Sequence, residues 1–200
     1  IEQLLGITLN AINIFGLQIN PGFIFALLVI ILFAIINFIG IKVSVKLNFL
    51  MSLIETLGLL IIIAIGLPYL GQVNLLDLST SVNGFSGVLI AAGLIFFAFL
   101  GFEDIVNVAE ETKNPKKNIP LALILSLAIS MIVYILVALV AVSAVPFGEL
   151  ASAKAPLALV AGKLFGNSAF LLIAFIALLS TANTILISLI GASRRTFGMA

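Results

Sequence analysis

The stretch FFAFLGFEDIVNVAEETKNPKKNIP, from Phe96 to Pro120, carries most of the information about how this chain folds. It begins as an apolar run that is rich in phenylalanine and contains a glycine, and this run ends at two adjacent acids, Glu103 and Asp104. A charged loop with a proline follows, and another long apolar run starts directly after it. This order predicts a membrane helix with a weak point, followed by a connector outside the hydrocarbon.

The composition is that of a chain embedded in a lipid bilayer. Of its 200 residues, 63% are hydrophobic and 8% are charged, with a mean hydropathy of +1.39, whereas soluble domains are about 25% charged. The apolar residues come in blocks of roughly 20, the length that crosses about 30 Å of hydrocarbon. We therefore expect an all-α integral membrane protein.

Some classes of function are disfavoured by the residues that the chain lacks. It contains no histidine and no cysteine, so it offers no imidazole base, thiol nucleophile or haem ligand of those types and no usual zinc site. The acids inside apolar runs are single, without a nucleophile beside them, and we expect no enzyme, no cofactor and no metal site. A net charge of +1 does not favour binding to nucleic acid.

Five apolar blocks are long enough to span the membrane, and we assign them to a single membrane domain over residues 1–200. They cover residues 21–43, 48–70, 85–106, 120–144 and 167–190. Residues 1–20 are apolar but dotted with asparagine and glutamine, which fits either the tail of an earlier span with a loop or an interfacial helix. Because the chain starts without methionine and its last residues resemble no terminus, we expect it to be a fragment of a longer protein.

The basic residues predict the orientation, because cytoplasmic loops collect Lys and Arg. With the connector at residues 107–119 placed in the cytoplasm, threading five spans leaves only two basic residues, Lys154 and Lys163, outside. The others then lie inside, namely Lys42, Lys46, Lys113, Lys116, Lys117, Arg194 and Arg195. We expect a multi-pass protein of the cytoplasmic membrane.

The order FAFLGFE at residues 97–103, followed by AEETKNPKKNIP at residues 109–120, resembles the amino acid–polyamine–organocation (APC) permeases, in which this motif covers the sixth span and the loop into the seventh. Residues 42–46 resemble the junction of that family's fourth and fifth spans, and residues 193–200 resemble the end of its eighth. Only residues 1–20 match poorly. The resemblance implies spans four to eight of about twelve, within a LeuT-like bundle built from inverted repeats.

The resemblance also implies a function. It points to a secondary active permease that carries amino acids across the membrane by alternating access, with the proton as the first candidate for the coupling ion and sodium as the other. A polyamine or cation carrier, or an exchanger on the same scaffold, is an alternative, and so is a sensor subunit that binds an amino acid without transporting it. The remaining spans of the full-length protein would complete the substrate pocket.

The weak point of the third block is the predicted substrate site. A helix that unwinds inside a membrane exposes backbone groups, which is tolerated only where they face a cavity or a ligand. By resemblance, the break falls at Phe97 to Gly101, backbone atoms of Ala98, Phe99 and Leu100 meet the charged ends of an amino acid, and Phe97 closes over it. The alternative is that these glycines and phenylalanines only pack against neighbouring helices.

Glu55 is the residue of the second block whose charge is most unfavourable inside a membrane. It lies roughly 10 Å inside that block by helical rise, too deep for a short carboxylate to reach water. Burial disfavours the charged form of a carboxyl group, so Glu55 could bind and release a proton. By resemblance, its position matches a lysine of some proton-coupled members, and the change to glutamate leaves the coupling ion open between a proton and another cation. A structural hydrogen bond is the alternative.

The last block contains hydroxyl residues at three- and four-residue spacing, which places them on one helical face. They are Ser180, Thr181, Thr184 and Ser188. In the related sodium-coupled fold, hydroxyls of the eighth span face the fifth span at the ion site, so we predict that Ser180, Thr181 and Thr184 contribute to ion coupling with Glu55. Such hydroxyls also serve as hydrogen bonds between helices, and we assign that role to Asn183 and Asn37.

Glu103 ends the third block at the predicted cytoplasmic interface. Solvated acids are common at such a position, but the family motif retains a glutamate where Glu103 falls. We therefore predict that Glu103 helps to hold an inner gate.

Overall fold

The computed structural model describes residues 12–14, 17–19, 21–71, 73–74, 84–102, 105–106, 109 and 112–199. Its elements are β1 (Ile12–Ile14), β2 (Leu17–Ile19), α2 (Pro21–Ile39), α3 (Ile41–Gly66), η1 (Leu67–Tyr69), α4 (Gly84–Phe96), η3 (Phe97–Phe99), α5 (Pro115–Ala144), α6 (Phe147–Ser152), α7 (Pro156–Phe165) and α8 (Asn167–Met199). The η elements are 3-10 helices. The predicted all-α membrane fold is confirmed.

Within the described residues, four helices are long and apolar enough to cross a membrane. They are Pro21–Ile39, Ile41–Tyr69, Pro115–Ala144 and Asn167–Met199. The third predicted span corresponds to α4 with η3, a shorter apolar helix over Gly84–Phe99. Its thirteen α-helical and three 3-10 residues give a length of about 26 Å, just short of the hydrocarbon thickness.

Two helix starts differ from those expected, and α8 ends at Met199, nine residues beyond the predicted end at residue 190. The predicted link after residue 43 is helical, and the chain breaks instead at Gly40, whose φ of 147° favours glycine. The helix predicted to begin at Pro120 begins at Pro115, with Asn114 in the left-handed conformation before it. Proline fits the first turn because its missing N–H would have no helical partner there, and Pro120 is accommodated inside the helix.

Helices α3, α5, α7 and α8 enclose the larger core. The core residues are Ile62, Val140, Val145, Ala158, Val160, Ala161 and Ile173. Glycines let these helices approach closely: a Cβ atom at Gly66 of α3 would collide with Val140 of α5, and one at Gly58 would lie 2.9 Å from Ile176 of α8. Small residues at contacts are the usual means of helix packing in membranes.

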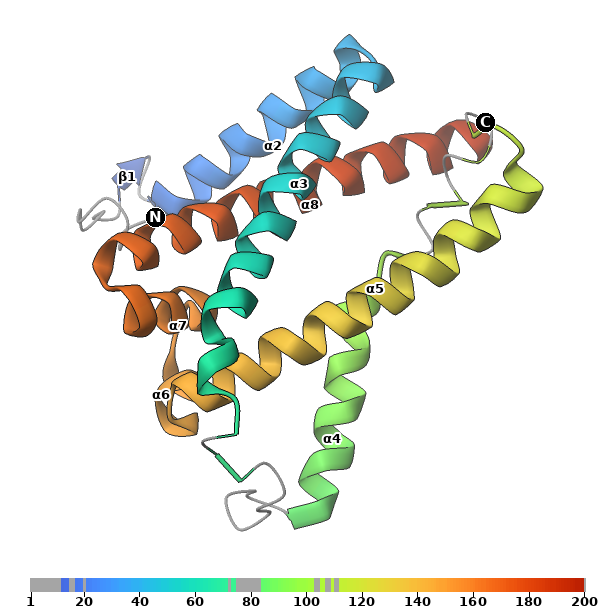
Figure 1. The fold of residues 1–200 in the computed structure, drawn as a ribbon. Coiled ribbons are helices and arrows are strands. Elements are labelled where there is room, and N and C mark those ends of the chain that lie inside the picture. The colour runs from blue at the N-terminus through green and yellow to red at the C-terminus, as the bar shows by residue number, and fades with distance from the viewer. Residues whose placement is uncertain are drawn as a thin grey trace.

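A second core lies where α2 and α3 meet α8, and it contains Phe33, Met51, Leu186 and Ile190. In Figure 1, α2 and α3 meet at one end and diverge, α3 crosses α8, α5 lies below them, and α4 projects away from the other helices. Packing of α3 against both α5 and α8 makes it the central element.

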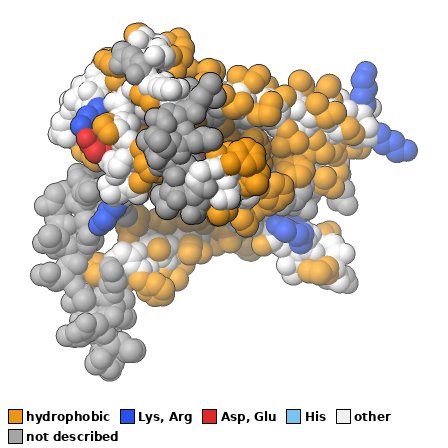
Figure 2. All heavy atoms as spheres, turned by 90° about the horizontal axis from the view of Figure 1, so that it is seen from below, with side chains coloured by type: hydrophobic (Ala, Val, Ile, Leu, Met, Phe, Trp, Pro, Cys, Tyr) orange, Lys and Arg blue, Asp and Glu red, His pale blue; other side chains and the backbone are white. Residues whose placement is uncertain are grey.

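The outer surface is apolar, as lipid requires. Large side chains such as Phe38, Phe49 and Leu94 are exposed. In Figure 2 hydrophobic side chains cover much of the visible helical surface, and the basic groups lie toward its margins. This distribution suits helices whose outer faces meet hydrocarbon.

The described part of residues 1–20 forms neither of the two structures considered for it. Strands β1 and β2 pair as an antiparallel hairpin, with Ile12 opposite Ile19 and Ile14 opposite Leu17. Alternation of apolar and polar residues in INI and LQI has the two-residue period of a strand.

Candidate functional site

Glu55 lies at the middle of the central helix. It is fourteen residues from Ile41 and fourteen from Tyr69, or about 20 Å from either end by helical rise. Because α3 starts earlier than expected, this position is deeper than the sequence suggests. The side chain is half-buried, its Oε1 atom is buried, and no group in the described part of the chain donates a hydrogen bond to that atom.

Ser180 and Asn183 of α8 are the polar side chains placed beside the Glu55 carboxyl group. Asn183 is buried, and its amide joins α8 to α3 at two points. The Asn48 Nδ2 donates to Asn183 Oδ1 at 3.0 Å, and Asn183 Nδ2 donates to Ser52 Oγ at 3.0 Å. These bonds agree with the interhelical role predicted for Asn183, and they hold α8 against the face of α3 that carries Glu55.

Asn37 also takes part in a polar contact between helices. The hydroxyl of Ser44, which is fully buried in α3, donates to Asn37 Oδ1 of α2 at 3.3 Å. The two amides, Asn37 and Asn183, thus tie α2 and α8 to α3 on the same half of the helix.

Glu55 and Ser180 line one cavity of about 530 Å³ between α3, α5, α7 and α8. Its other lining residues are Gly58, Leu59, Ile62, Tyr134, Lys154, Ala155, Pro156, Leu157, Ala158, Ile173, Ile176 and Ala177. The volume is within the range of small-molecule sites, about 300–1,000 Å³, and the wall is mostly apolar with a few polar groups, which is also typical of such sites. Glu55 and Ser180 therefore meet as predicted from their spans.

The other predicted hydroxyls point elsewhere. Thr181 donates to the carbonyl of Ala177, and Thr184 donates to that of Ser180, each at 3.0 Å and within α8. Both threonines are exposed in the described part of the chain and do not line the cavity. The structure thus brings Ser180, but not Thr181 or Thr184, to the Glu55 cavity.

Helix α4 is interrupted where the sequence places the weak point. The α-helix ends at Phe96, η3 covers Phe97–Phe99, Leu100 is extended, and Gly101 has a φ of 101° that favours glycine. The Leu100 N–H donates to the Phe97 carbonyl at 3.3 Å. The helical path therefore stops at Leu100, and the backbone beyond it is free to turn.

Phe97 projects outward at this interruption, with 65% of its surface exposed, and its ring meets that of Phe96 edge-on at 6.5 Å. Its ring lies beside the interruption and is not among the described residues that line the Glu55 cavity. Binding by residues 97–101 stays a prediction. Glu103 lies outside the described residues.

Tyr134 is a residue that the sequence reasoning missed. Its hydroxyl donates to the Ala98 carbonyl at 3.3 Å, and its ring lies 5.3 Å from that of Phe99. Tyr134 also lines the Glu55 cavity, so one side chain contacts both predicted sites. The sequence did contain a signal for this contact, because Tyr134 is one of two tyrosines in the chain and lies inside the apolar run of residues 120–144. Tyrosine hydroxyls in apolar surroundings usually find a hydrogen-bond partner.

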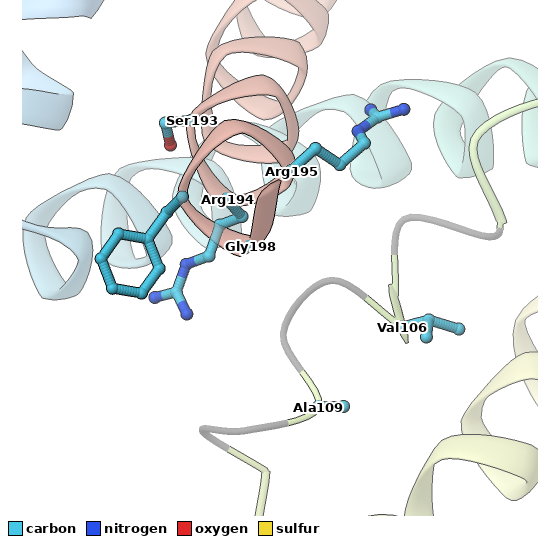
Figure 3. Close-up of a pocket in the computed structure, with 7 residues that line it drawn as sticks. Val106, Ala109, Ser193, Arg194, Arg195 and Gly198 are labelled. Carbon is cyan, nitrogen blue, oxygen red and sulfur yellow. The ribbon is translucent and has the colours of Figure 1, made fainter. Parts of the chain in front are cut away.

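A second cavity, of about 570 Å³, lies between the end of α8 and the connector. It is lined by Val106, Ala109, Ser193, Arg194, Arg195, Phe197 and Gly198. In Figure 3 the arginine side chains leave α8 in different directions, with Arg195 on the side that faces the connector. Arg195 Nε donates to the Gly191 carbonyl at 3.2 Å. The end of α8 and the described residues of the connector therefore face each other here.

The chain matches the family model described as amino acid permease over residues 4–200. The chain belongs to the amino acid permease family. It is similar to a branched-chain amino acid permease of Bacillus subtilis, with 33% identity over 88% of this chain and 37% of that protein. It is also similar to cationic amino acid transporter 9, chloroplastic, of Arabidopsis thaliana, with 32% identity over 80% of the chain and 28% of the relative.

An aspartate-proton symporter of Bacillus subtilis is 33% identical over 62% of the chain and 24% of its own length. The family and these relatives are membrane transporters and not enzymes, which confirms the resemblance seen in the connector. The chain spans about two fifths of the length of the branched-chain permease that it matches.

Proposed function

We propose that this permease chain belongs to a secondary active transporter that moves amino acids across the cytoplasmic membrane by alternating access, with Glu55 as its proton-coupling group. The observation that carries the proposal is the buried Glu55 oxygen at the middle of α3, which accepts no hydrogen bond within the described residues. A carboxylate charge is costly at this depth. Binding a proton would remove that charge, and releasing it would restore it.

The substrate site in this proposal is the interrupted helix at residues 97–101. Carbonyls at the end of a helix lack helical partners and carry partial negative charge, so those near Ala98 and Phe99 suit an ammonium group. Phe97, exposed beside them, would close over the bound amino acid. Substrate sites of broken-helix transporters are built from such backbone groups.

Two observations support the proton as the coupling ion. Glu55 offers a single carboxyl group, and a relative that covers 62% of this chain is named an aspartate-proton symporter. A sodium ion would instead need several oxygen ligands, for which Ser180, Thr181 and Thr184 are the candidates on α8. The threonine hydroxyls donate within their own helix and do not line the Glu55 cavity, so of these three only Ser180 is placed beside Glu55, which favours the proton.

The substrate is an amino acid in this proposal, and the names of the relatives suggest branched-chain or cationic side chains. A carrier of polyamines or other organic cations is a second candidate, because the Glu55 carboxylate, in a mostly apolar cavity that Lys154 also lines, would attract an ammonium group. The connector at residues 107–119 lies in the cytoplasm, and Glu103 contributes to an inner gate. The remaining spans of the full-length protein complete the pocket.

Uptake by the purified full-length protein in proteoliposomes tests this function. The panel is labelled L-leucine, L-lysine, L-aspartate and putrescine, each with an imposed pH gradient or an imposed sodium gradient. Accumulation of an amino acid under the pH gradient alone is expected. Accumulation that needs sodium would indicate that the α8 hydroxyls, and not Glu55, bind the coupling ion. Uptake of putrescine alone would favour the cation carrier. Binding without accumulation would indicate a sensor.

A further inference from the structure

We propose that the Tyr134 hydroxyl stands in for the substrate's ammonium group at the Ala98 carbonyl in the substrate-free transporter, and that a bound amino acid displaces it. This inference rests on the proposed function, because it takes the interrupted helix as the substrate site. It assigns a positioning role to a side chain on α5.

The first support is the position of the Ala98 carbonyl. The preceding carbonyl, that of Phe97, accepts from the Leu100 N–H. The helix then stops at the extended Leu100, so Ala98 lies in the turn whose carbonyls lose their helical partners. The Tyr134 hydroxyl donates to it, as an ammonium group of a ligand would do.

The second support is the weakness of this bond. Its length is 3.3 Å, whereas hydroxyl-to-oxygen bonds are usually about 2.5–3.0 Å. A bond from an ammonium group is charge-assisted, shorter and about twice as strong. An arriving amino acid therefore replaces a long neutral bond with a stronger one, and the exchange costs little.

The third support is that Tyr134 is held by its ring as well as by its hydroxyl. The ring packs against Phe99 at 5.3 Å, so a hydroxyl that loses Ala98 remains at the edge of the break. The same side chain lines the cavity that holds Glu55 and Ser180. A displaced hydroxyl would lie at the wall of this mostly apolar cavity, whose few polar groups include Glu55 and Ser180, and this connects occupation of the break to the surroundings of Glu55.

Replacement of Tyr134 with phenylalanine tests the inference in the full-length protein. The Tyr134→Phe variant keeps the ring and removes the competing donor, so the affinity for L-leucine or L-lysine in equilibrium binding should rise by about 2-fold, the effect of a weak hydrogen bond. A purely structural hydroxyl would leave affinity unchanged or lower it. The affinity for 4-methylpentanoate, which has no ammonium group, should not rise.

Tyr69→Phe is the matched control, because Tyr69 is the other tyrosine of the chain and lies in η1 at the far end of α3. Its affinity should equal that of the parent. A second measurement needs no amino acid: hydrogen exchange of the backbone over residues 96–101 should be faster in Tyr134→Phe than in Tyr69→Phe. Tyr134→Leu, which also removes the ring from Phe99, should increase exchange further.

The outcomes separate the two proposals. If the parent protein accumulates the panel amino acids but Tyr134→Phe binds them equally or more weakly, the inference about Tyr134 is overturned and the proposed function stands. Unchanged exchange over residues 96–101 would also overturn it. If the parent neither binds nor accumulates any of them, the proposed function fails, whatever the exchange measurement gives.

Discussion

At the scale of single residues, the proposed proton coupling depends on Glu55. Its carboxyl group lies at the middle of a membrane helix, so the gain or loss of one charge there changes the free energy of the site more than at a surface. In Glu55→Gln the amide keeps the shape and cannot exchange a proton. We expect this variant of the full-length protein to bind substrate but to lose gradient-driven accumulation.

Glu149→Gln is the matched control for Glu55. Glu149 lies in α6, where its carboxylate pairs with Lys163 at 2.9 Å and is about half exposed. Exposed ion pairs contribute only about 0–1 kcal/mol, so uptake should not change. Accumulation by Glu55→Gln that equals the parent's at every pH would remove Glu55 from the mechanism.

Phe97 tests the substrate site at the same scale. An aromatic side chain that closes over a ligand buries its exposed surface on binding, which is worth about 1.5–3 kcal/mol. Phe97→Ala should therefore weaken the apparent affinity in uptake by roughly tenfold or more. Phe85→Ala, at the other end of α4 and similarly exposed, should have no such effect, and equal affinity in both variants would place the substrate elsewhere.

At the scale of elements, the contact between α3 and α5 depends on a residue without a side chain. A Cβ atom at Gly66 would collide with the Val140 side chain, whereas one at Gly93 of α4 would meet nothing within 4 Å. Overpacking usually costs about 1–3 kcal/mol. Gly66→Ala should lower the unfolding temperature of the detergent-solubilised full-length protein.

Gly93→Ala provides the control, and since alanine is favoured over glycine in a helix by about 1 kcal/mol, its unfolding temperature should stay or rise. Adding Val140→Ala to Gly66→Ala should restore part of the loss because it frees the space. A Gly66→Ala protein as stable as the parent would mean that α3 and α5 do not meet as described.

The sequence predicts where the helices begin and end better than it predicts which helices contact one another. Apolar runs located α2, α3, α5 and α8 to within a few residues at several ends, but Gly40 and Pro115 moved two starts. Both shifts follow from backbone preferences that act on one residue. The Tyr134 contact could not be found this way, because its partner lies thirty-six residues away on another helix.

At the scale of the whole molecule, the proposed orientation makes a direct prediction. Lys113 precedes α5 and Lys154 follows it. A single crossing by α5, about 45 Å long by helical rise, puts these positions on opposite sides of the membrane. In a cysteine-free background of the full-length protein, Lys113→Cys should react with a membrane-impermeant maleimide only from the cytoplasmic side.

Lys154→Cys should react only from the external side, and Lys163→Cys, which lies in the last turn of α7 on the same side in this topology, serves as its control. Labelling of residues 113 and 154 from one side would contradict the single crossing. Labelling from opposite sides with the order reversed would contradict the orientation alone.

The sequence alone predicts membrane insertion, the helical class and the interruption near Gly101. Each helix satisfies its own backbone hydrogen bonds, and each apolar run can contact lipid without help from other helices. Which side chains lie against each helix face was decided only by the tertiary structure. It places Ser180 and Asn183 beside Glu55 and Val140 over Gly66. It also places Tyr134 against Ala98 and Phe99. Lipid is as apolar as the helix faces, so hydrophobicity does not distinguish a packed face from an exposed one. Close fit between small and large side chains selects the packed faces, and that fit exists only once the helices lie together.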